Sequence, residues 1–429
     1  MKSKNVLCPL LSLLLMLFLA GGATASAQVV TNTADSGPGT LRSAITNAAS
    51  GAVITFDPSL SGATITLSNT LAINTNLTID ASALPGGIQI NGNGSVQIFI
   101  VATNITVFLN SLTITNGYSI NDGGGIFNYG TLTLTNCTVS GNSAPGGLGG
   151  GIFNYYEGTL ALNQCTLSGN SGGGIFNNGL LTLNQCTLSG NSAPYGIGGG
   201  IYNFEGSTTS LSQCTLSGNS GTFGGGGIFN YGATLTMKNT VVAGNGGRPG
   251  ADIYNDNSAT LTYGGSNLVQ SVDNPGSTIT GPAPLTNAPD LAPLGSYGGP
   301  TQTMPPLPGS PAIGAGSVAA NTFTTDQRGY ARTQNGLIDL GAVELQSPAA
   351  NPPVLGNITV PAGGGNGLQF TFTNAPAADF TVLTATNVAL ALTNWTVLGE
   401  VQQVAPGQYQ FTDPQAATNS VRFYRVRSP

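Results

Sequence analysis

The sequence predicts an all-β protein, a right-handed single-stranded parallel β-helix followed by a small antiparallel β-sandwich. Three observations lead to this fold class. A line of the type GGGIFNYGTLTLTNCTVSGNS, first seen at residues 123–143, recurs along the chain with a period near 25 residues. Each copy holds short runs of alternating apolar and polar residues, and single residue types return in fixed columns.

The period favours one solenoid coil per copy. Successive isoleucines of the repeat are separated by 26, 23, 26, 27 and 25 residues, and they are Ile126, Ile152, Ile175, Ile201, Ile228 and Ile253. A propeller blade needs roughly 40–50 residues. Three short strands in this length fit a β-helix coil instead, in which each strand pairs with its copy one coil later at about 4.8 Å.

Two asparagine columns predict ladders at two corners of the coil, because stacked amides can hydrogen-bond one another and asparagine tolerates a left-handed backbone. The first column is Asn128, Asn154, Asn177, Asn203, Asn230 and Asn255. The second, each member following a glycine, is Asn142, Asn170, Asn191, Asn219 and Asn245.

The chain is predicted to divide into a signal peptide (1–27), an N-terminal cap with irregular first coils (28–118), regular coils with a C-terminal cap (119–346), a linker (347–357) and a β-sandwich module (358–429). Lys2 and Lys4 precede an apolar run and a small-residue cleavage site that ends at Ala27. We therefore expect export to the extracellular space or the outer surface of a bacterium, with no membrane span in the mature chain.

Between these boundaries, several shorter stretches predict individual elements. TLRSAITNAAS, residues 40–50, has apolar residues at helical spacing and predicts a short helix over the open first coil. The charged residues of 326–344 predict ion pairs that close the last coil. Alternating runs after residue 367 predict antiparallel strands around Trp395, the single tryptophan.

Four cysteines share one repeat position: Cys137, Cys165, Cys186 and Cys214. In-register side chains point the same way, which favours a ladder of internal thiols, whereas the spacing of neighbouring coils leaves one or two disulfides open. The chain has no histidine, and cysteines on successive coils do not converge, so no metal site and no cofactor are predicted. A net charge of −6 without a long basic run argues against nucleic acid as a partner.

The repeats resemble those of polymorphic outer membrane proteins, which are bacterial surface adhesins. VTNTADSGPGTLRSAI, LGSYGGPTQTMPPLPGSPAIGAG and TDQRGYAR…IDLGAVE resemble the choice-of-anchor Q group of exported bacterial proteins. This resemblance spans residues 29–346 and implies a β-helix at the cell surface, with no catalytic residues to transfer. The tail resembles a β-sandwich module found at the C-terminus of exported bacterial proteins. No run of barrel strands follows the linker, so self-translocation of the adhesin kind is not expected.

For function, the sequence favours a non-enzymatic adhesin, glycan-binding or structural surface protein, with a polysaccharide or a surface protein as partner; it does not predict the oligomeric state. The alternative is a β-helix polysaccharide lyase or glycoside hydrolase. Its weak catalytic candidates are Asp252, Asp256, Glu157 and Glu205. A hydrolase needs two carboxylates at a defined separation, and a lyase needs a basic residue beside an acidic cluster; neither pattern is complete.

A column of aromatic residues offers a binding hypothesis. If the isoleucine of GIFN points inward, the next residue points outward. This column is Phe127, Phe153, Phe176, Tyr202, Phe229 and Tyr254, and Tyr129, Tyr155, Tyr156, Phe204 and Tyr231 lie near the same corner. Exposed, the column would form a stripe for stacking on sugar rings; covered, it would be structural packing, which is the interpretation that the sequence favours.

Overall fold

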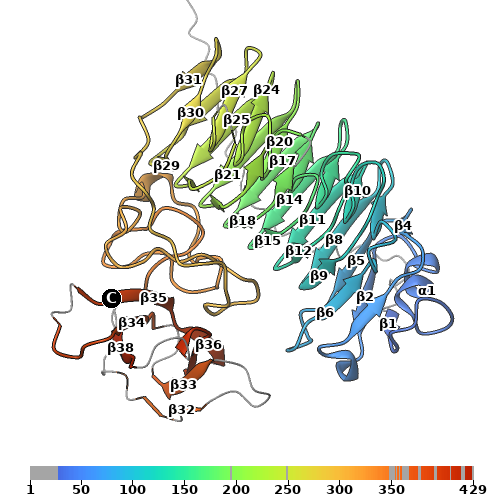
Figure 1. Cartoon of the computed structure of the whole chain (residues 1–429). Coiled ribbons are helices and arrows are strands. Elements are labelled where there is room, and N and C mark those ends of the chain that lie inside the picture. The colour runs from blue at the N-terminus through green and yellow to red at the C-terminus, as the bar shows by residue number, and fades with distance from the viewer. Residues whose placement is uncertain are drawn as a thin grey trace, which may run out of the picture.

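The computed structural model describes residues 28–193, 196–247 and 250–346 (Figure 1). In the C-terminal part it describes residues 353, 355–356, 358–359, 367–374, 378–390, 394–405, 407–416 and 421–427. The predicted signal peptide and most of the predicted linker lie outside these residues. In the described part of the chain, no helix has the length and apolarity that a membrane crossing requires.

Three parallel sheets form the walls of a solenoid, because every strand pairs with its counterpart one coil away. Sheet A contains β1 (Gln28–Val30), β2 (Ala52–Phe56), β5 (Leu77–Asp80), β8 (Thr106–Asn110), β11 (Thr131–Thr135), β14 (Thr159–Asn163), β17 (Leu180–Asn184), β21 (Thr208–Ser212), β25 (Thr234–Lys238), β28 (Thr260–Tyr263) and β31 (Thr278–Thr280). Sheet B contains β3 (Thr64–Thr66), β6 (Ile88–Asn91), β9 (Leu112–Thr115), β12 (Thr138–Ser140), β15 (Thr166–Ser168), β18 (Thr187–Ser189), β22 (Thr215–Ser217), β26 (Val241–Val242) and β29 (Leu268–Val269). Sheet C contains β4 (Leu71–Ile73), β7 (Phe99–Val101), β10 (Ile126–Asn128), β13 (Ile152–Asn154), β16 (Ile175–Asn177), β20 (Ile201–Asn203), β24 (Ile228–Tyr231), β27 (Ile253–Asp256) and β30 (Val272–Asp273). The predicted all-β parallel solenoid is confirmed.

The register places like residues on top of one another. Ile126 pairs with Ile152, and Ile152 pairs with Ile175, so the isoleucine column runs unbroken through the interior. The leucines of sheets A and B do the same, and these columns form one continuous core that extends from Val30 to Val269. Each coil alone could not bury its apolar face, so the stack of coils is the stable unit.

Both asparagine ladders are present, and every member of the first is fully buried. In the first ladder each Nδ2 donates to the Oδ1 of the next coil over 2.7–2.9 Å, and Asn255 extends it to Asn274. The second ladder joins sheets B and C, with Nδ2 to Oδ1 distances of 2.8–3.0 Å. Buried amides satisfied in this way are stabilising, because each member polarises the next.

The asparagines of the second ladder do not have the left-handed backbone conformation that was expected for them. The left-handed conformation is taken by the preceding glycine, as at Gly190 with φ of 67°, and not by the asparagine. The glycines before each isoleucine have another role. A Cβ at Gly174 would lie 2.6 Å from the carbonyl oxygen of Gly200 on the next coil, so close approach of the coils requires glycine there.

The four described cysteines are free and buried. Of the two predicted arrangements, the structure therefore has the ladder of internal thiols and not the disulfides. The Cys137 Sγ donates to the carbonyl oxygens of Thr135 and Leu109 at 3.3 and 3.4 Å. The backbone N–H of Cys165 in turn donates to the Cys186 Sγ. Burial raises the pKa of the Cys137 and Cys186 thiols, which keeps them protonated.

Helix α1 (Leu41–Thr46) covers the N-terminal end of the solenoid, as predicted. Thr40 caps it by accepting a hydrogen bond from the Ser43 N–H. Leu41, Ala44 and Ile45 are buried against the first coils, where the apolar interior would otherwise end in solvent. A short 3₁₀ helix, η1 (Pro58–Leu60), follows on the next coil.

The segment of residues 285–346 lies along the outer side of sheet B (Figure 1), which corrects the expectation that its charged residues close the last coil. An amide column at the corner between sheets A and B holds it. Gln164, Gln185, Gln213 and Asn239 donate to Asp326, Thr325, Asn321 and Ser317, respectively. The outward threonines of sheet B add further bonds, such as Thr187 Oγ1 to Gln327 Oε1 at 2.7 Å. The short helix η2 (Val318–Ala320) belongs to this segment.

The C-terminal module consists of two small antiparallel sheets, as expected from its alternating runs. One contains β32 (Ile358–Thr359), β33 (Leu368–Thr373), β37 (Gln408–Asp413) and β36 (Gln402–Ala405); the other contains β35 (Thr396–Glu400), β34 (Thr381–Ala385) and β38 (Phe423–Arg427). Its main core is built by aromatic residues that include Phe370, Phe380 and Tyr409. Trp395 is buried in a smaller cluster beside Leu383, so it does not form the centre. Two further short strands, β19 (Ser192–Ala193) and β23 (Ser220–Gly221), pair in the loops of the solenoid.

Candidate ligand-binding site

Two columns of aromatic rings cover the outer face of sheet C. The first is the predicted stripe, which points outward because the residues on either side, such as Ile152 and Asn154, are buried in the interior. Its neighbouring ring centroids lie 4.5–5.4 Å apart from Phe127 to Tyr254. The second column flanks it, with Tyr129 and Tyr155 at 5.0 Å and Phe204 and Tyr231 at 6.0 Å. Stacking along both columns stabilises this side of the solenoid.

Mutual stacking leaves little of the first column accessible. Phe153, Phe176 and Phe229 are only 5–6% exposed, and Phe127, Tyr202 and Tyr254 are half-buried. Burial also raises the pKa of Tyr202 to about 12. The column therefore serves mainly as packing, and its buried rings cannot offer a flat platform to a sugar.

Exposed rings gather at one place, at the start of the second column. Tyr129, Tyr155 and Tyr156 are 36%, 44% and 61% exposed. Two of these rings, Tyr155 and Tyr156, lie in a longer connection: Asn154 and Thr159 are separated by four residues, whereas Asn128 and Thr131 are separated by two. The longer connection forms a turn in which the Gly158 N–H donates to the Tyr155 carbonyl oxygen at 2.8 Å.

The turn holds Glu157 in a left-handed conformation, with φ of 63°. A type II-like turn of this kind prefers glycine or asparagine at that position, and another residue there is disfavoured by about 1 kcal/mol. Side chains kept in such a conformation often belong to binding sites. Glu157 is exposed next to Tyr156, at the rim of the same corner.

These residues line a cleft of about 290 Å³, which we call the tyrosine cleft. It is lined by Thr103, Asn104, Tyr129, Gly130, Thr131, Tyr155, Tyr156 and Glu157. Three ring faces, two hydroxyl side chains, an amide and one carboxylate thus converge at one corner of neighbouring coils. This combination of stacking surface and hydrogen-bonding groups suits a small polar ligand with an apolar face.

The four candidate carboxylates do not come together as a catalytic pair. Asp252 is 2% exposed and accepts hydrogen bonds from Asn245 and Ser271. Asp256 is half-buried and accepts from the Asn257 N–H. Glu157 is the one carboxylate among the residues that line the tyrosine cleft, and Glu205 is exposed outside it.

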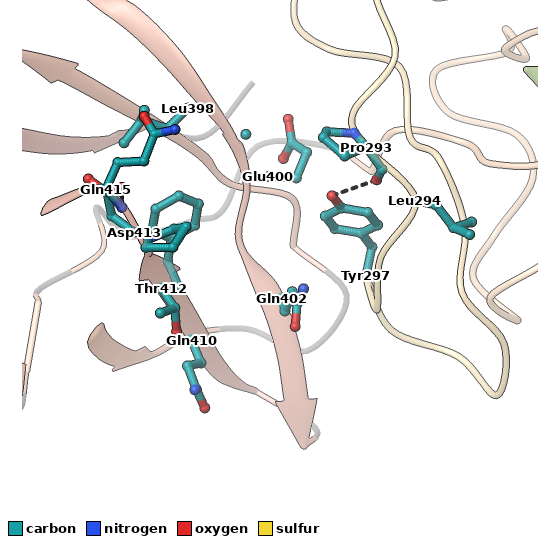
Figure 2. A pocket seen from close by; sticks show the side chains of 13 residues that line it. Pro293, Leu294, Tyr297, Leu398, Glu400, Gln402, Gln410, Thr412, Asp413 and Gln415 are labelled. Atoms are coloured by element: carbon teal, nitrogen blue, oxygen red, sulfur yellow. Dashed lines mark hydrogen bonds between the residues drawn. The ribbon is translucent and has the colours of Figure 1, made fainter. Parts of the chain in front are cut away.

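A second cavity, of about 410 Å³, lies between the segment of residues 285–346 and the C-terminal module. Figure 2 shows the Glu400 carboxylate beside Pro293 and the Tyr297 ring, whose hydroxyl donates to the Pro293 carbonyl oxygen at 2.9 Å. Burial raises the pKa of Glu400 to about 8, and the Thr381 hydroxyl donates to its Oε1 at 2.9 Å. Sequence reasoning did not single out this cavity, because its walls come from segments about 100 residues apart.

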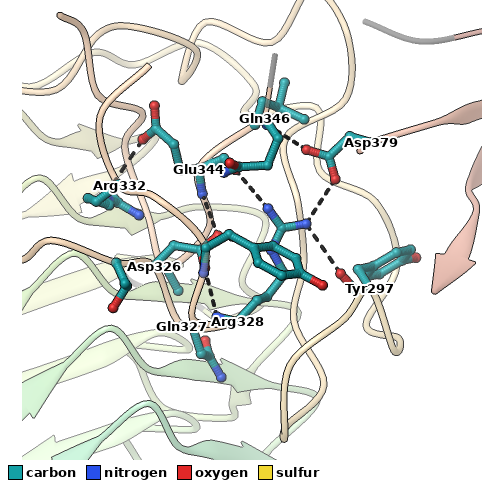
Figure 3. A network of polar contacts seen from close by, with 12 residues as sticks. Tyr297, Asp326, Gln327, Arg328, Arg332, Glu344, Gln346 and Asp379 are labelled. Atoms are coloured by element: carbon teal, nitrogen blue, oxygen red, sulfur yellow. Dashed lines mark hydrogen bonds and ion pairs between the residues drawn. The ribbon is translucent and has the colours of Figure 1, made fainter. Parts of the chain in front are cut away.

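A buried polar network fixes the module next to this cavity (Figure 3). The Arg328 guanidinium contacts Asp326 and Asp379, each at 2.9 Å, and donates to the Glu344 carbonyl oxygen at 2.7 Å. Its side chain is completely buried. Arg332 donates to the carbonyl oxygens of Asp339 and Gly341, and burial raises the pKa of Glu344 to about 8. The predicted ion pairs Arg328–Asp326 and Arg332–Glu344 lie within the segment of residues 285–346, and the pair of Arg328 with Asp379, which was not predicted, connects this segment to the C-terminal module.

Comparison with known proteins agrees with the observed coils. The family model described as right handed beta helix region matches residues 130–282, which include coils of all three sheets. No curated protein matches the chain. With its parallel coils, its asparagine ladders and this match, the protein is a right-handed parallel β-helix repeat protein.

Proposed function

We propose that this is an exported surface or extracellular protein, not an enzyme, that binds carbohydrate through the tyrosine cleft. The observation that carries the proposal is the convergence of three exposed tyrosine rings with hydroxyl, amide and carboxylate groups. Sugar rings have apolar C–H faces that stack on aromatic rings, and hydroxyls that require polar partners at the edge.

The size of the cleft indicates which part of a glycan it would take. At about 290 Å³ it is at the lower end of ligand pockets, which are roughly 300–1,000 Å³. A terminal mono- or disaccharide suits it better than a long internal stretch of polymer. The carboxylate of Glu157 and the absence of a basic residue among the lining residues favour a neutral or amino sugar over an acidic one.

The same lining argues against hydrolysis. Retaining and inverting glycosidases both place two carboxylates across the scissile bond, about 5 Å or 6.5–9.5 Å apart. Only Glu157 is present among the lining residues of the tyrosine cleft, and Asp252 is engaged in the interior of the solenoid. A binding role therefore fits better than the lyase or hydrolase alternative.

Export is supported by the N-terminal sequence, in which two lysines, an apolar run and Ala25-Ser26-Ala27 follow one another. The resemblance of residues 29–346 to the choice-of-anchor Q group supports a location at the bacterial surface. A solenoid that displays its ligand site on one outer side is suited to adhesion, because it presents the site away from the C-terminal module.

A glycan-array screen of residues 28–429 tests the proposal. The chain is compared with a Tyr155→Ala, Tyr156→Ala double variant and with Phe223→Ala as a control, since Phe223 is 64% exposed on a different loop. Binding by the parent and the control that is lost in the folded double variant would support the tyrosine cleft. No binding by the parent, or equal binding by the double variant, would refute it.

A further inference from the structure

The outer face of sheet A carries two straight columns of short hydroxyl side chains. In β21, β25 and β28 the second and fourth residues are buried, so the first and third point outward. From β21 to β31 every outward pair consists of threonine or serine. These residues are Thr208 and Ser210, Thr234 and Thr236, Thr260 and Thr262, and Thr278 and Thr280. Thr131 and Thr133 repeat the pair in β11, and the two strands between contain Ala161 and Leu180.

The register turns these residues into a regular array. Thr208, Thr234, Thr260 and Thr278 face one another in consecutive strands without a shift. The outward residues therefore repeat at about 4.8 Å from coil to coil and at roughly 6.6 Å along each strand. The hydroxyl oxygens of Thr262 and Thr280 are 3.0 Å apart, so these two side chains turn toward each other and share a hydrogen bond at the C-terminal end of the array. Threonine is branched at Cβ and has a restricted χ1, so the array is ordered before any ligand arrives.

The two columns are also uncharged, and Lys238, the outward fifth residue of β25, lies beside them. From β8 to β31 the two columns contain no ionisable side chain. Sheet B is covered by the segment of residues 285–346 and sheet C by its aromatic columns, whereas Thr208, Thr234 and Thr278 remain exposed. An uncharged partner with a rigid repeat is the electrostatic and geometric complement of this surface.

We propose that the threonine face of sheet A binds the surface of ice. An ice lattice is uncharged, alternates donors and acceptors, and has an oxygen repeat on its prism planes close to the spacing between neighbouring coils. The hydroxyls can join the lattice while the methyl groups between them order the adjacent water. A crystalline glycan would be bound through flat aromatic rings, and from β11 to β31 the two columns contain none.

The test measures thermal hysteresis and inhibition of ice recrystallisation by the chain from Gln28 to Pro429. A Thr236→Tyr, Thr262→Tyr variant places bulky rings in the array but keeps strand propensity, so its fold is checked by its melting curve. Thr113→Tyr is the matched control, because Thr113 is an outward, half-buried residue of sheet B in β9.

The expected result is faceted ice crystals and inhibited recrystallisation by the parent and by Thr113→Tyr. The double variant should need at least about tenfold more protein for the same inhibition, a factor that corresponds to about 1.4 kcal/mol. Three results would overturn the proposal. They are a parent without effect on ice, a folded double variant as active as the parent, and binding of the parent to microcrystalline cellulose that the double variant loses.

Discussion

Asn245 Nδ2 donates to Asp252 Oδ1 at 2.9 Å, and this contact ends the second asparagine ladder. Asp252 occupies the position at which earlier coils have Gly200 and Gly227. Its carboxylate also accepts from the Asn245 N–H and from the Ser271 hydroxyl, so it takes the place of the asparagine that the next coil lacks. Asp252, which the sequence offered as a catalytic candidate, therefore has a structural role: it terminates the second asparagine ladder.

Replacing Asp252 tests this role. Asp252→Ala leaves two partly buried donors of Asn245 without an acceptor and should lower the free energy of unfolding by about 2–3 kcal/mol. Asp252→Asn keeps an acceptor oxygen and should cost less than about 1 kcal/mol. Denaturant unfolding of both variants measures the difference. Equal losses would show that the negative charge matters and the ladder geometry does not.

The thiol ladder predicts slow chemical reactivity. Cys137, Cys165, Cys186 and Cys214 are fully buried, so Ellman's reagent cannot reach them in the native chain at about pH 8, and burial also raises the pKa of the Cys137 and Cys186 thiols. For the chain of residues 28–429 we expect negligible reaction when folded and four thiols per molecule in guanidinium without reductant. Fewer than four thiols in the denatured, unreduced protein would reveal a disulfide and contradict the ladder.

Arg328 predicts how the C-terminal module is held. Arg328→Ala leaves Asp326 and Asp379 buried without their cation, and we expect a loss of about 3–5 kcal/mol. Hydrogen exchange should quicken in β34, which follows Asp379, while the ladder amides stay protected. Arg422→Ala serves as the control, because Arg422 pairs with Asp413 inside the module. Unchanged exchange in β34 of Arg328→Ala would show that the network does not hold the module.

Glu400 predicts a pH dependence of stability. Its pKa is raised from 4.5 to about 8, so the native state keeps a proton that the unfolded chain releases above pH 4.5. The contribution of neutral Glu400 is full below pH 4.5 and is lost as the pH rises towards 8, on the order of a few kcal/mol. Glu400→Gln should make this decline smaller, leaving the share of Glu344, whose pKa is also raised to about 8, so that the variant exceeds the parent in stability at pH 8 but not at pH 4.5. A parent whose unfolding free energy rises across this window, with Glu400→Gln behaving alike, would contradict the assignment.

The repeated parts of the fold were predictable because a solenoid column repeats its residue. The Asn128 column and the cysteine column each identify a corner or a wall of the coil from the amino-acid sequence alone. The glycine before each asparagine of the second ladder also predicts a left-handed turn, although the asparagine itself was assigned that conformation. The helix α1 followed from apolar spacing and from the need to cover an open end.

The parts that do not repeat were harder to place. The segment of residues 285–346 binds sheet B through side chains such as Gln185, and its own sequence contains no periodic signal for that wall. Gln164, Gln185, Gln213 and Asn239 each directly precede the cysteine position of the repeat, and this column of amides could have indicated that a segment binds along this wall. Accessibility of the aromatic stripe depends on stacking between coils, which alternation alone cannot predict. The tyrosine cleft contains the connection Tyr155–Gly158, one of three four-residue connections at this corner, and the sequence alone does not single it out from residues 204–207 and 256–259.

The most direct test of carbohydrate binding compares Tyr156→Phe with Tyr156→Ala by calorimetry, using the strongest glycan from the array. Stacking requires the ring and not the hydroxyl, so Tyr156→Phe should bind within about twofold of the parent. Tyr156→Ala should bind at least about tenfold more weakly, because the lost ring removes buried apolar area. Equal affinities for the parent and both variants would contradict the tyrosine cleft as the site of binding.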